Sequence, residues 1–170
     1  MSDKLPFSEV VSRHGATVLL VCRAVVGPVD ADDAWSETFV SALRAYPALP
    51  AGANVEAWLV TIAHRKAIDL LRKARRSATP MADVPAAPTR RTDDPSVVDL
   101  RRLLARLPER QRLAVVYHYV GGLPYAEVAA AMGGSPDAAR RAAADGIARL
   151  RKAESITARG ETARAREGRS

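Results

Sequence analysis

A proline-rich segment near the middle of the chain limits what this protein can fold into more than any other feature. Residues 77–96, SATPMADVPAAPTRRTDDPS, contain four prolines and no apolar periodicity. Proline fixes φ and removes a backbone donor, so neither a helix nor a central strand runs easily through such a stretch. On both sides of the segment, apolar residues recur at helical spacing. The pattern predicts two helical blocks joined by a flexible linker.

The two blocks are expected to be small and entirely helical. Neither shows the alternation of apolar and polar residues that a half-buried strand requires. Much of the apolar content is alanine, which favours helix but buries little area per residue. We therefore predict an all-α fold with two small domains, at residues 1–76 and 97–153. The linker occupies 77–96, and a polar, frayed tail occupies 154–170.

The first block contains three helical patterns. The first pattern stops at Gly27–Pro28, and Asp30 is placed to cap the second, ADDAWSETFVSALRAY. The third, VEAWLVTIAHRKAIDLLRKARR, follows a cap at Asn54. At about 100° per residue its polar side is basic, opposite an apolar arc. The residues on that side, with the two lysines at its shoulder, are Thr61, Arg65, Arg72, Arg76, Lys66 and Lys73.

The second block repeats the theme with shorter helices. VVDLRRLLARL is one helix, and Pro108 is expected as the first residue of the next, which Gly121–Gly122 ends. PYAEVAAAM follows and ends at Gly133–Gly134. Ser135 is then placed to cap the last helix, with Pro136 as its first residue. A helix, a glycine turn and a newly capped helix are typical of a helix-turn-helix, whose second helix enters a DNA groove.

Charge favours an acidic partner, and the residue types exclude common catalytic sites. The formal net charge is +7, and residues 101–152 alone contribute +6 of it, as expected of a nucleic-acid-binding protein. His14, His64 and His118 lack metal-ligand spacing, so His14 and His118 are interpreted as structural. No phosphate-binding glycine loop or nucleophile elbow occurs. We expect no enzyme activity, no catalytic residue, no cofactor and no metal.

The compartment is predicted from cysteine use and from the N-terminal segment. Cys22 is the only cysteine, which fits a reducing compartment, and its apolar neighbours predict a buried thiol. The first ten residues lack the basic and apolar regions of a signal peptide. We therefore expect a cytoplasmic protein that does not insert into membranes.

Each feature taken alone also has a plainer interpretation. The basic side of the third helix is equally consistent with a solvated helix surface. Helix pairs broken by glycine are common in bundles. The acidic start of the second helix can serve capping and solubility alone. Only the combination of the three points to one function.

Together and in this order, the features resemble the extracytoplasmic-function (ECF) sigma factors of bacterial RNA polymerase. The motifs that carry the resemblance are DADDAWSETF, AIDLLRK and LPERQRLAVVYHYVGGLPYAEVA, and it covers about residues 5–153. It implies a promoter-specificity subunit with two helical domains, called regions 2 and 4. The implied partners are core RNA polymerase and promoter DNA, and the family allows an anti-sigma factor as a further partner.

The resemblance also assigns roles to individual residues. It places the acidic helix on core polymerase, through Asp32, Asp33, Ser36 and Glu37. It places the loop 47–54 and the long helix on the −10 element, through Tyr46, Asn54, Trp58, Thr61, Arg65, Lys66, Arg72, Lys73 and Arg76. Melting DNA needs a cationic groove and aromatic surface, which this set supplies. The helix-turn-helix would contact the −35 element through Ser135, Asp137, Arg140, Arg141, Ala144 and Asp145.

The sequence departs from the family in three of these places. The family often has glutamine at Ser36 and asparagine at Arg65. Its reading helix usually carries a Thr-Val-Lys-Ser-Arg run, where this chain has alanines and two arginines followed by Asp145. The reading helix should therefore contact DNA weakly. Two rival functions stay open from the residues alone: a helix-turn-helix regulator that acts without polymerase, and a helical adaptor that binds only proteins.

Overall fold

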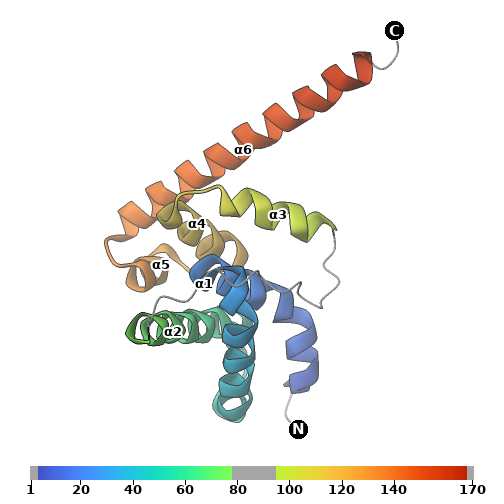
Figure 1. Cartoon of the computed structure of the whole chain (residues 1–170). Coiled ribbons are helices and arrows are strands. Elements are labelled where there is room, and N and C mark those ends of the chain that lie inside the picture. The colour runs from blue at the N-terminus through green and yellow to red at the C-terminus, as the bar shows by residue number, and fades with distance from the viewer. Residues whose placement is uncertain (1–3, 78–94, 168–170) are drawn as a thin grey trace.

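The structure is a computed structural model that describes residues 4–77 and 95–167, with side chains described for 4–77 and 98–156. The described residues are helical with short connections and contain no strand, which confirms the predicted all-α fold (Figure 1). The elements are α1 (Phe7–Ala45), the 3₁₀ turn η1 (Tyr46–Ala48), α2 (Val55–Arg76), α3 (Pro95–Ala105), α4 (Glu109–Val115), the π-helical turn η2 (Val116–Val120), α5 (Tyr125–Met132) and α6 (Pro136–Glu167).

α1 consists of two helical segments that meet at a kink. Gly27 has φ 80° and ψ −179°, which is not helical, and Pro28 follows it. This confirms the predicted break at Gly27–Pro28. Because proline is already set for a first helical turn, the second segment begins at Pro28. Asp30 therefore lies inside that segment and does not cap it, which corrects the prediction.

The core of the first block forms between α1 and α2. Val18, Val21 and Cys22 of α1 are fully buried, as are Leu59 and Ala63 of α2. The burial of Cys22 confirms its predicted structural role, and burial raises the pKa of its thiol to about 12. By length and composition alone, the segment Phe7–Ala48 is apolar enough to cross a membrane. In the most apolar window of that segment, 39% is buried inside the protein.

In the second block, α4 and α5 pack against α6. The close approach of α4 to α6 requires glycine at position 146 of α6. A Cβ there would lie 2.7 Å from Val115 Cγ2 of α4, which is too close. Pro108 and Pro124 are the N-cap residues of α4 and α5, with ψ of 145° and 152°. The sequence predicted that Pro108 would be the first residue of the helix, but it is the N-cap residue immediately before that first residue. An extended ψ places a proline just outside a helix and still ends the preceding turn.

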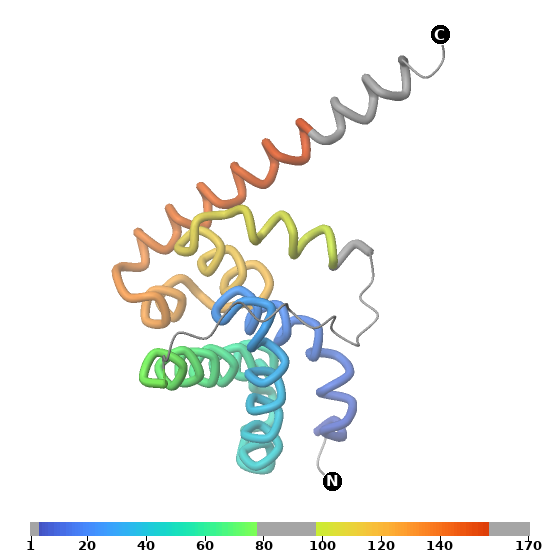
Figure 2. The backbone as a smooth tube through the Cα atoms, viewed as in Figure 1, coloured from blue at the N-terminus to red at the C-terminus, as the bar shows by residue number. Residues whose placement is uncertain are grey.

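α6 is longer than predicted. A frayed tail was expected from residue 154, but the helix continues to Glu167. Alanine, arginine and glutamate dominate this part of the sequence, and all three favour helix. In Figure 2, α6 leaves the rest of the second block well before its last coloured residue.

The two blocks also pack on each other, since α1 contacts α3, α4 and η2. Figure 1 shows the middle of α1, near its kink, next to α4. The expected linker, 77–96, lies almost entirely outside the described residues. α3 begins at Pro95, so its first turn starts inside that expected linker.

Candidate nucleic-acid and protein interfaces

An acidic surface lies on the second segment of α1. The predicted residues Asp32, Asp33, Ser36 and Glu37 are all exposed there. Positions 33 and 37 are one turn apart, so their carboxylates share a face. Glu37 Oε2 lies 4.0 Å from Lys66 Nζ of α2. The structure thus brings the expected polymerase-binding residues together, beside a cation from the adjacent helix.

Two exposed apolar residues extend this surface and were missed from the sequence. Val40 is 47% exposed and Leu43 is 55% exposed. At about 100° per residue, Val40 and Leu43 fall within the same arc of about 120° on α1 as Asp33, Ser36 and Glu37. We call Asp33, Ser36, Glu37, Val40 and Leu43 the docking stripe. The sequence could have indicated that these two residues are exposed. Val40 and Leu43 do not fit the helical spacing of the core residues Trp35, Thr38, Phe39 and Ala42.

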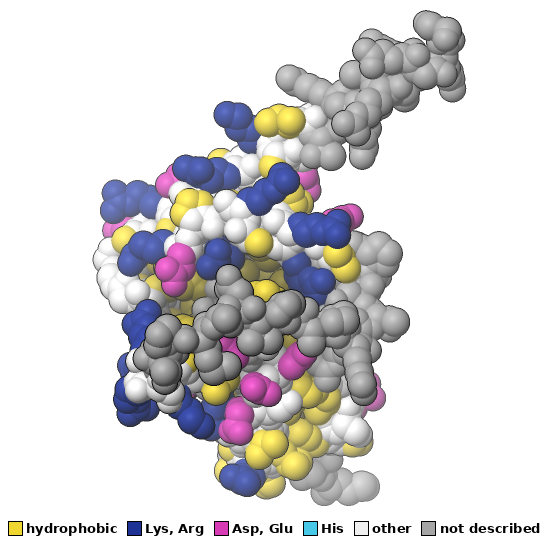
Figure 3. Space-filling model, viewed as in Figure 1, with side chains coloured by type: hydrophobic (Ala, Val, Ile, Leu, Met, Phe, Trp, Pro, Cys, Tyr) yellow, Lys and Arg dark blue, Asp and Glu magenta, His cyan; other side chains and the backbone are white. Residues whose placement is uncertain are grey.

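The polar side of α2 carries a row of cations. Arg65, Arg72, Lys73 and Arg76 are exposed, as predicted. The Lys66 side chain is less exposed, at 31%, and its Nζ faces Glu37. Thr61 is half-buried, and its hydroxyl donates to the Ala57 carbonyl at 2.9 Å. In Figure 3, Lys and Arg side chains gather at the edge where α2 ends, apart from the acidic and apolar side chains over α1.

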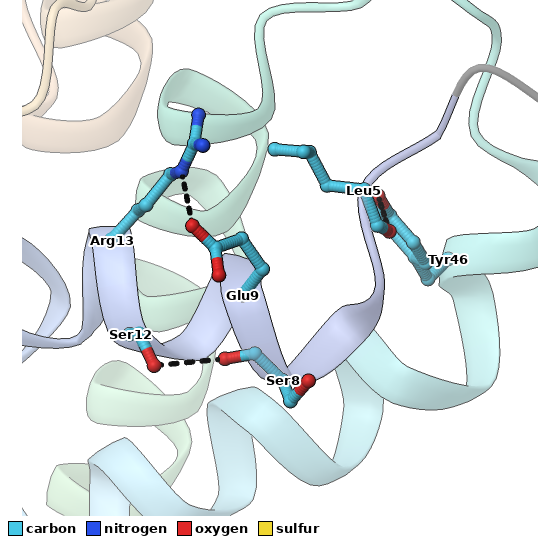
Figure 4. Close-up of polar contacts among 6 residues, drawn as sticks. All are labelled: Leu5, Ser8, Glu9, Ser12, Arg13 and Tyr46. Atoms are coloured by element: carbon cyan, nitrogen blue, oxygen red, sulfur yellow. Dashed lines mark hydrogen bonds and ion pairs between the residues drawn. The ribbon is translucent and has the colours of Figure 1, made fainter.

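The loop between α1 and α2 is bounded by two half-buried aromatic rings. The ring centroids of Tyr46 and Trp58 are 6.3 Å apart, with an angle of 39° between the planes. Asn54 caps α2 as predicted, its side-chain oxygen accepting from Ala57 N at 3.0 Å. The Tyr46 hydroxyl donates to the Leu5 carbonyl at 2.8 Å (Figure 4). Tyr46 is therefore held in place by the N-terminal segment.

Lys4 adds a cation to this loop that no sequence pattern indicated. Its Nζ donates to the Tyr46 and Pro47 carbonyls at 3.2 and 2.9 Å. The same Nζ lies 5.6 Å from the centre of the Tyr46 ring. The contact joins residues more than forty positions apart, which periodicity cannot detect. Figure 4 shows the adjacent first turns of α1, where Arg13 Nε donates to Glu9 Oε1 at 2.9 Å.

The helix-turn-helix forms as predicted at α5 and α6. Ser135 caps α6, its Oγ accepting from Ala138 N at 3.2 Å. Ala139 and Ala143 are buried, at 3% and 0% exposure, against the rest of the block. The predicted DNA-facing residues, which lie on the other side of α6, are all exposed. These are Asp137, Arg140, Arg141, Ala144 and Asp145.

Comparison with known proteins identifies the family of this scaffold. The family model Sigma-70 region 2 matches residues 10–77, and Sigma-70, region 4 matches residues 98–150. The sigma factor CarQ of Myxococcus xanthus is 34% identical over 152 residues, which cover 86% of this chain and 87% of CarQ. The ECF sigma factor SigM of Mycobacterium tuberculosis is 30% identical, over 87% of this chain and 76% of SigM. This chain belongs to the ECF sigma factors.

Solved structures agree on the fold of this sigma factor. CnrH, solved with the cytosolic domain of CnrY, superposes with a TM-score of 0.54 at 24% identity, over 88% of each chain. RpoE of Bartonella quintana, solved with the anti-sigma factor NepR, superposes with a TM-score of 0.59 at 20% identity. That match covers 86% of this chain and 94% of RpoE. The family assignment confirms the resemblance seen in the sequence.

In this sigma factor, Arg140 of α6 contacts two neighbours. Arg140 Nη1 donates to Asp137 Oδ1 at 3.1 Å, and its guanidinium lies 5.2 Å from the centre of the Tyr125 ring. The ring of His118 also stacks on Tyr125, with the two ring centroids 3.9 Å apart. Tyr119, nearby on η2, is 57% exposed. Sequence reasoning missed these contacts because their residues come from three separate elements, η2, α5 and α6.

The histidines of the sigma factor make structural contacts. His14 Nδ1 lies 3.1 Å from Glu56 Oε2, which joins α1 to α2. His118 Nδ1 donates to the Leu123 carbonyl at 2.8 Å. Both contacts support the predicted structural roles. In the part of the chain that the structure describes, no group of three or more His, Cys, Asp or Glu side chains is arranged to hold a metal ion.

His64 joins the two blocks and predicts a pH dependence. Its Nδ1 lies 2.6 Å from the Tyr117 hydroxyl. Burial, and then the charge of Arg65, lower the pKa of His64 below its ordinary value of 6.5. Burial raises the pKa of Tyr117 far above its ordinary value, so the hydroxyl stays protonated and donates to the neutral imidazole. The folded protein therefore binds a proton at His64 less readily than the unfolded chain.

We expect the sigma factor to lose stability on acidification through this group. The contribution is complete above about pH 6.5 and is lost as the pH falls from there through the lowered folded pKa. Thermal unfolding of the wild type and of His64→Gln at pH 7.5 and 5.5 measures it. The variant should lose less stability between the two pH values than the wild type. Equal losses would show that His64 does not titrate differently on folding.

Proposed function

We propose how this sigma factor divides its function between its two blocks. It is a promoter-directing subunit that binds core RNA polymerase, and our proposal concerns the surfaces used. Residues 1–76 act on core polymerase and the −10 element, and residues 97–153 act on the −35 element. The observation that carries the proposal is the separation of the docking stripe on α1 from the exposed cations of α2 and α6. We propose that the protein does this by binding, without covalent chemistry of its own, in the cytoplasm.

The docking stripe has the composition of a protein interface. It combines exposed apolar side chains, Val40 and Leu43, with the carboxylates of Asp33 and Glu37. Apolar patches edged by charge mark sites of protein association. Its negative charge disfavours nucleic acid and suits a basic protein surface. We therefore assign it to core polymerase rather than to DNA.

The surface of α2 fits a single strand of DNA. Single-strand sites combine a cationic track for the backbone with aromatic rings for the bases. Arg65, Arg72 and Arg76 provide the track, and Tyr46 and Trp58 stand at its loop end. This arrangement supports a role in holding the melted −10 element.

The reading helix α6 fits duplex DNA with little base discrimination. Arg140 and Arg141 are its only cations near the groove entrance, and alanine offers at most a methyl contact to thymine. Most of the specificity should then come from polymerase docking and the −10 contacts. The relative RpoE was solved with an anti-sigma factor, and we propose that a protein of that kind also controls this one.

Reconstitution with core polymerase tests the proposal. The sigma factor should copurify with core enzyme and direct transcription from a subset of genomic fragments. A regulator that acts alone would bind duplex DNA equally well without polymerase. An adaptor would bind core enzyme without changing which fragments are transcribed. Either outcome would overturn the proposed division of function.

Replacing Asp145 with arginine should tighten duplex binding. Asp145 lies on the DNA-facing side of α6 with a charge that repels phosphate. The change turns a repulsion into a phosphate contact, which is expected to contribute about 1–2 kcal/mol at low salt. Binding of the sigma factor to a duplex fragment with the upstream element, titrated at low and high salt, measures the gain.

Glu154→Arg is the matched control for this prediction. It makes the same change of charge on α6, but nine residues further on, which places it on the opposite side of the helix. The control should bind duplex DNA nearly as the wild type does. Equal gains from both variants would assign the effect to net charge, and no gain from Asp145→Arg would move the DNA-facing surface elsewhere.

A further inference from the structure

A lysine that precedes α1 caps the turn that follows this helix. The last carbonyls of a helix have no N–H partner within it, and a cation is favoured beside them. Lys4 Nζ donates to the Tyr46 carbonyl at 3.2 Å and to the Pro47 carbonyl at 2.9 Å, both in η1. This cap ties the start of the chain to the loop between α1 and α2.

Two neighbours of Lys4 hold the side chain of Tyr46. Its hydroxyl donates to the Leu5 carbonyl at 2.8 Å (Figure 4). Its ring meets the Phe7 ring edge-on, with centroids 5.4 Å apart and an angle of 60° between the planes. We call residues 4–7 the anchor segment. It fixes the carbonyl, the ring and the hydroxyl of Tyr46 by three different contacts.

The tip of the loop between α1 and α2 stands in open space. Residues 50–52 are exposed. A Cβ placed on Gly52 would meet nothing within 4 Å. A backbone hydrogen bond from Ala53 N to the Pro50 carbonyl, 3.2 Å long, closes the tip on itself. The position of the tip therefore depends on how the two ends of the loop are fixed.

The two ends of the loop are fixed in different ways. Asn54 fixes the second end locally, because its side chain caps α2. At the first end, the Tyr46 carbonyl accepts from Leu49 N at 3.1 Å and also from Lys4 Nζ. The first end is thus held from outside the loop, by the anchor segment. A loop that is ordered before its ligand arrives loses less conformational entropy on binding.

We propose that Lys4 is a positioning residue for the −10 element, because it holds the loop 47–54 in its binding geometry before DNA arrives. The anchoring itself is a property of the free chain. Its consequence for promoters rests on the proposed function, in which this loop and α2 contact the −10 element. Flexible loops adapt to several partners, whereas a fixed loop fits few. Loss of the anchor should therefore reduce the discrimination between bases.

A direct contact between Lys4 and a phosphate would be a different role with a different result. An ammonium group has three N–H donors, and the two carbonyls accept two of them. A phosphate contact on a single strand would contribute about 0.7 to the salt slope of binding. A positioning residue leaves that slope unchanged and alters base discrimination. Titrations with salt and with altered bases therefore separate the two roles.

Hydrogen–deuterium exchange of the free, full-length protein tests the anchoring. Lys4→Met removes the ammonium group and keeps an unbranched side chain. Exchange over residues 46–54 should become about threefold faster or more, because local opening of this segment becomes easier. Circular dichroism should show unchanged helix content. Unchanged exchange in Lys4→Met would overturn the anchoring.

Arg13→Met is the matched control for Lys4→Met. It also replaces one cation with methionine, at an exposed position of α1 where Arg13 pairs with Glu9. Exchange over residues 46–54 should stay at the wild-type rate in this control. Faster exchange in both variants would assign the effect to net charge and overturn the specific role of Lys4.

Open-complex formation by the reconstituted holoenzyme tests the promoter consequence. The probes are one promoter fragment selected by the reconstitution and a set of fragments that each have one base of the −10 element changed. Lys4→Met should lower open-complex formation on the unchanged fragment by about five- to tenfold, as when one charge-assisted hydrogen bond is lost. The difference between unchanged and changed fragments should become smaller. The salt slope should match that of the wild type, and Arg13→Met should behave as the wild type throughout.

The results distinguish failure of this inference from failure of the proposed function. A lower salt slope with full base discrimination would make Lys4 a phosphate contact and overturn its positioning role. Faster exchange with unchanged open-complex formation and discrimination would overturn the promoter consequence alone. If base changes in the −10 element and the variant Arg65→Ala/Arg72→Ala both had no effect, the proposed −10 surface would fail, and the promoter consequence with it. The exchange measurement would still decide the anchoring, since it needs neither polymerase nor DNA.

Discussion

Replacing Glu37 with lysine is expected to weaken binding to core polymerase by at least tenfold, about 1.4 kcal/mol. Glu37 lies at the centre of the docking stripe, and its side chain is 61% exposed. The change reverses the charge presented to a basic partner. It also places the new ammonium group beside Lys66, which now faces Glu37 at 4.0 Å. Competition with labelled wild type for a limiting amount of core enzyme measures the loss.

Two further variants make this prediction specific. Glu127→Lys changes the charge equally on an exposed position of α5, away from the stripe, and should compete as the wild type does. Leu43→Ser leaves the charge unchanged and removes an exposed apolar contact, and it should also weaken binding. If Glu37→Lys competes for core enzyme as well as the wild type, the docking stripe is not the polymerase surface.

The second large effect is expected from replacing Arg65 and Arg72 together with alanine. Both side chains are exposed on the polar side of α2. Each lost phosphate contact to a single strand lowers the salt slope of binding by about 0.7, so the pair should lower it by about 1.4. Open-complex formation, followed by permanganate reactivity of unpaired thymines over a range of salt concentrations, measures both the loss and the slope.

Arg13→Ala combined with Arg102→Ala is the control for the arginine pair. It removes the same charge from exposed arginines that already pair with Glu9 and Asp99 on their own helices. Its slope should stay near that of the wild type. An unchanged slope for Arg65→Ala/Arg72→Ala would make the cations of α2 an ordinary solvated surface.

Most helix ends could be predicted because the signals that set them are local. Asn54 and Ser135 each cap a helix through a neighbour three residues away. Gly27 breaks α1 through its own φ, and Gly121 ends η2. Errors of one or two residues arose where proline was involved. Pro28 starts a segment before Asp30, and Pro108 stands just outside α4.

The surfaces were predicted as far as a helix face can be read from spacing. The acidic face of α1, the basic side of α2 and the outward side of α6 are exposed as expected. Val40 and Leu43 were overlooked because apolar residues were assigned to the core by default. Lys4 and the support of Arg140 by Tyr125 were not predictable, since each joins separate elements. Their roles in binding stay predictions.

The sequence alone determined the family, the helical class and the sides of the helices that face solvent. These properties depend on periodicity, caps and motifs, which are relations between residues a few positions apart. Only the tertiary structure decided that the second block rests on the first. Tyr117 and His64 are 53 positions apart, and Arg112 and Ala24 are 88 apart. Periodicity shows that a side chain will be buried, but which distant residue covers it depends on how whole helices pack together.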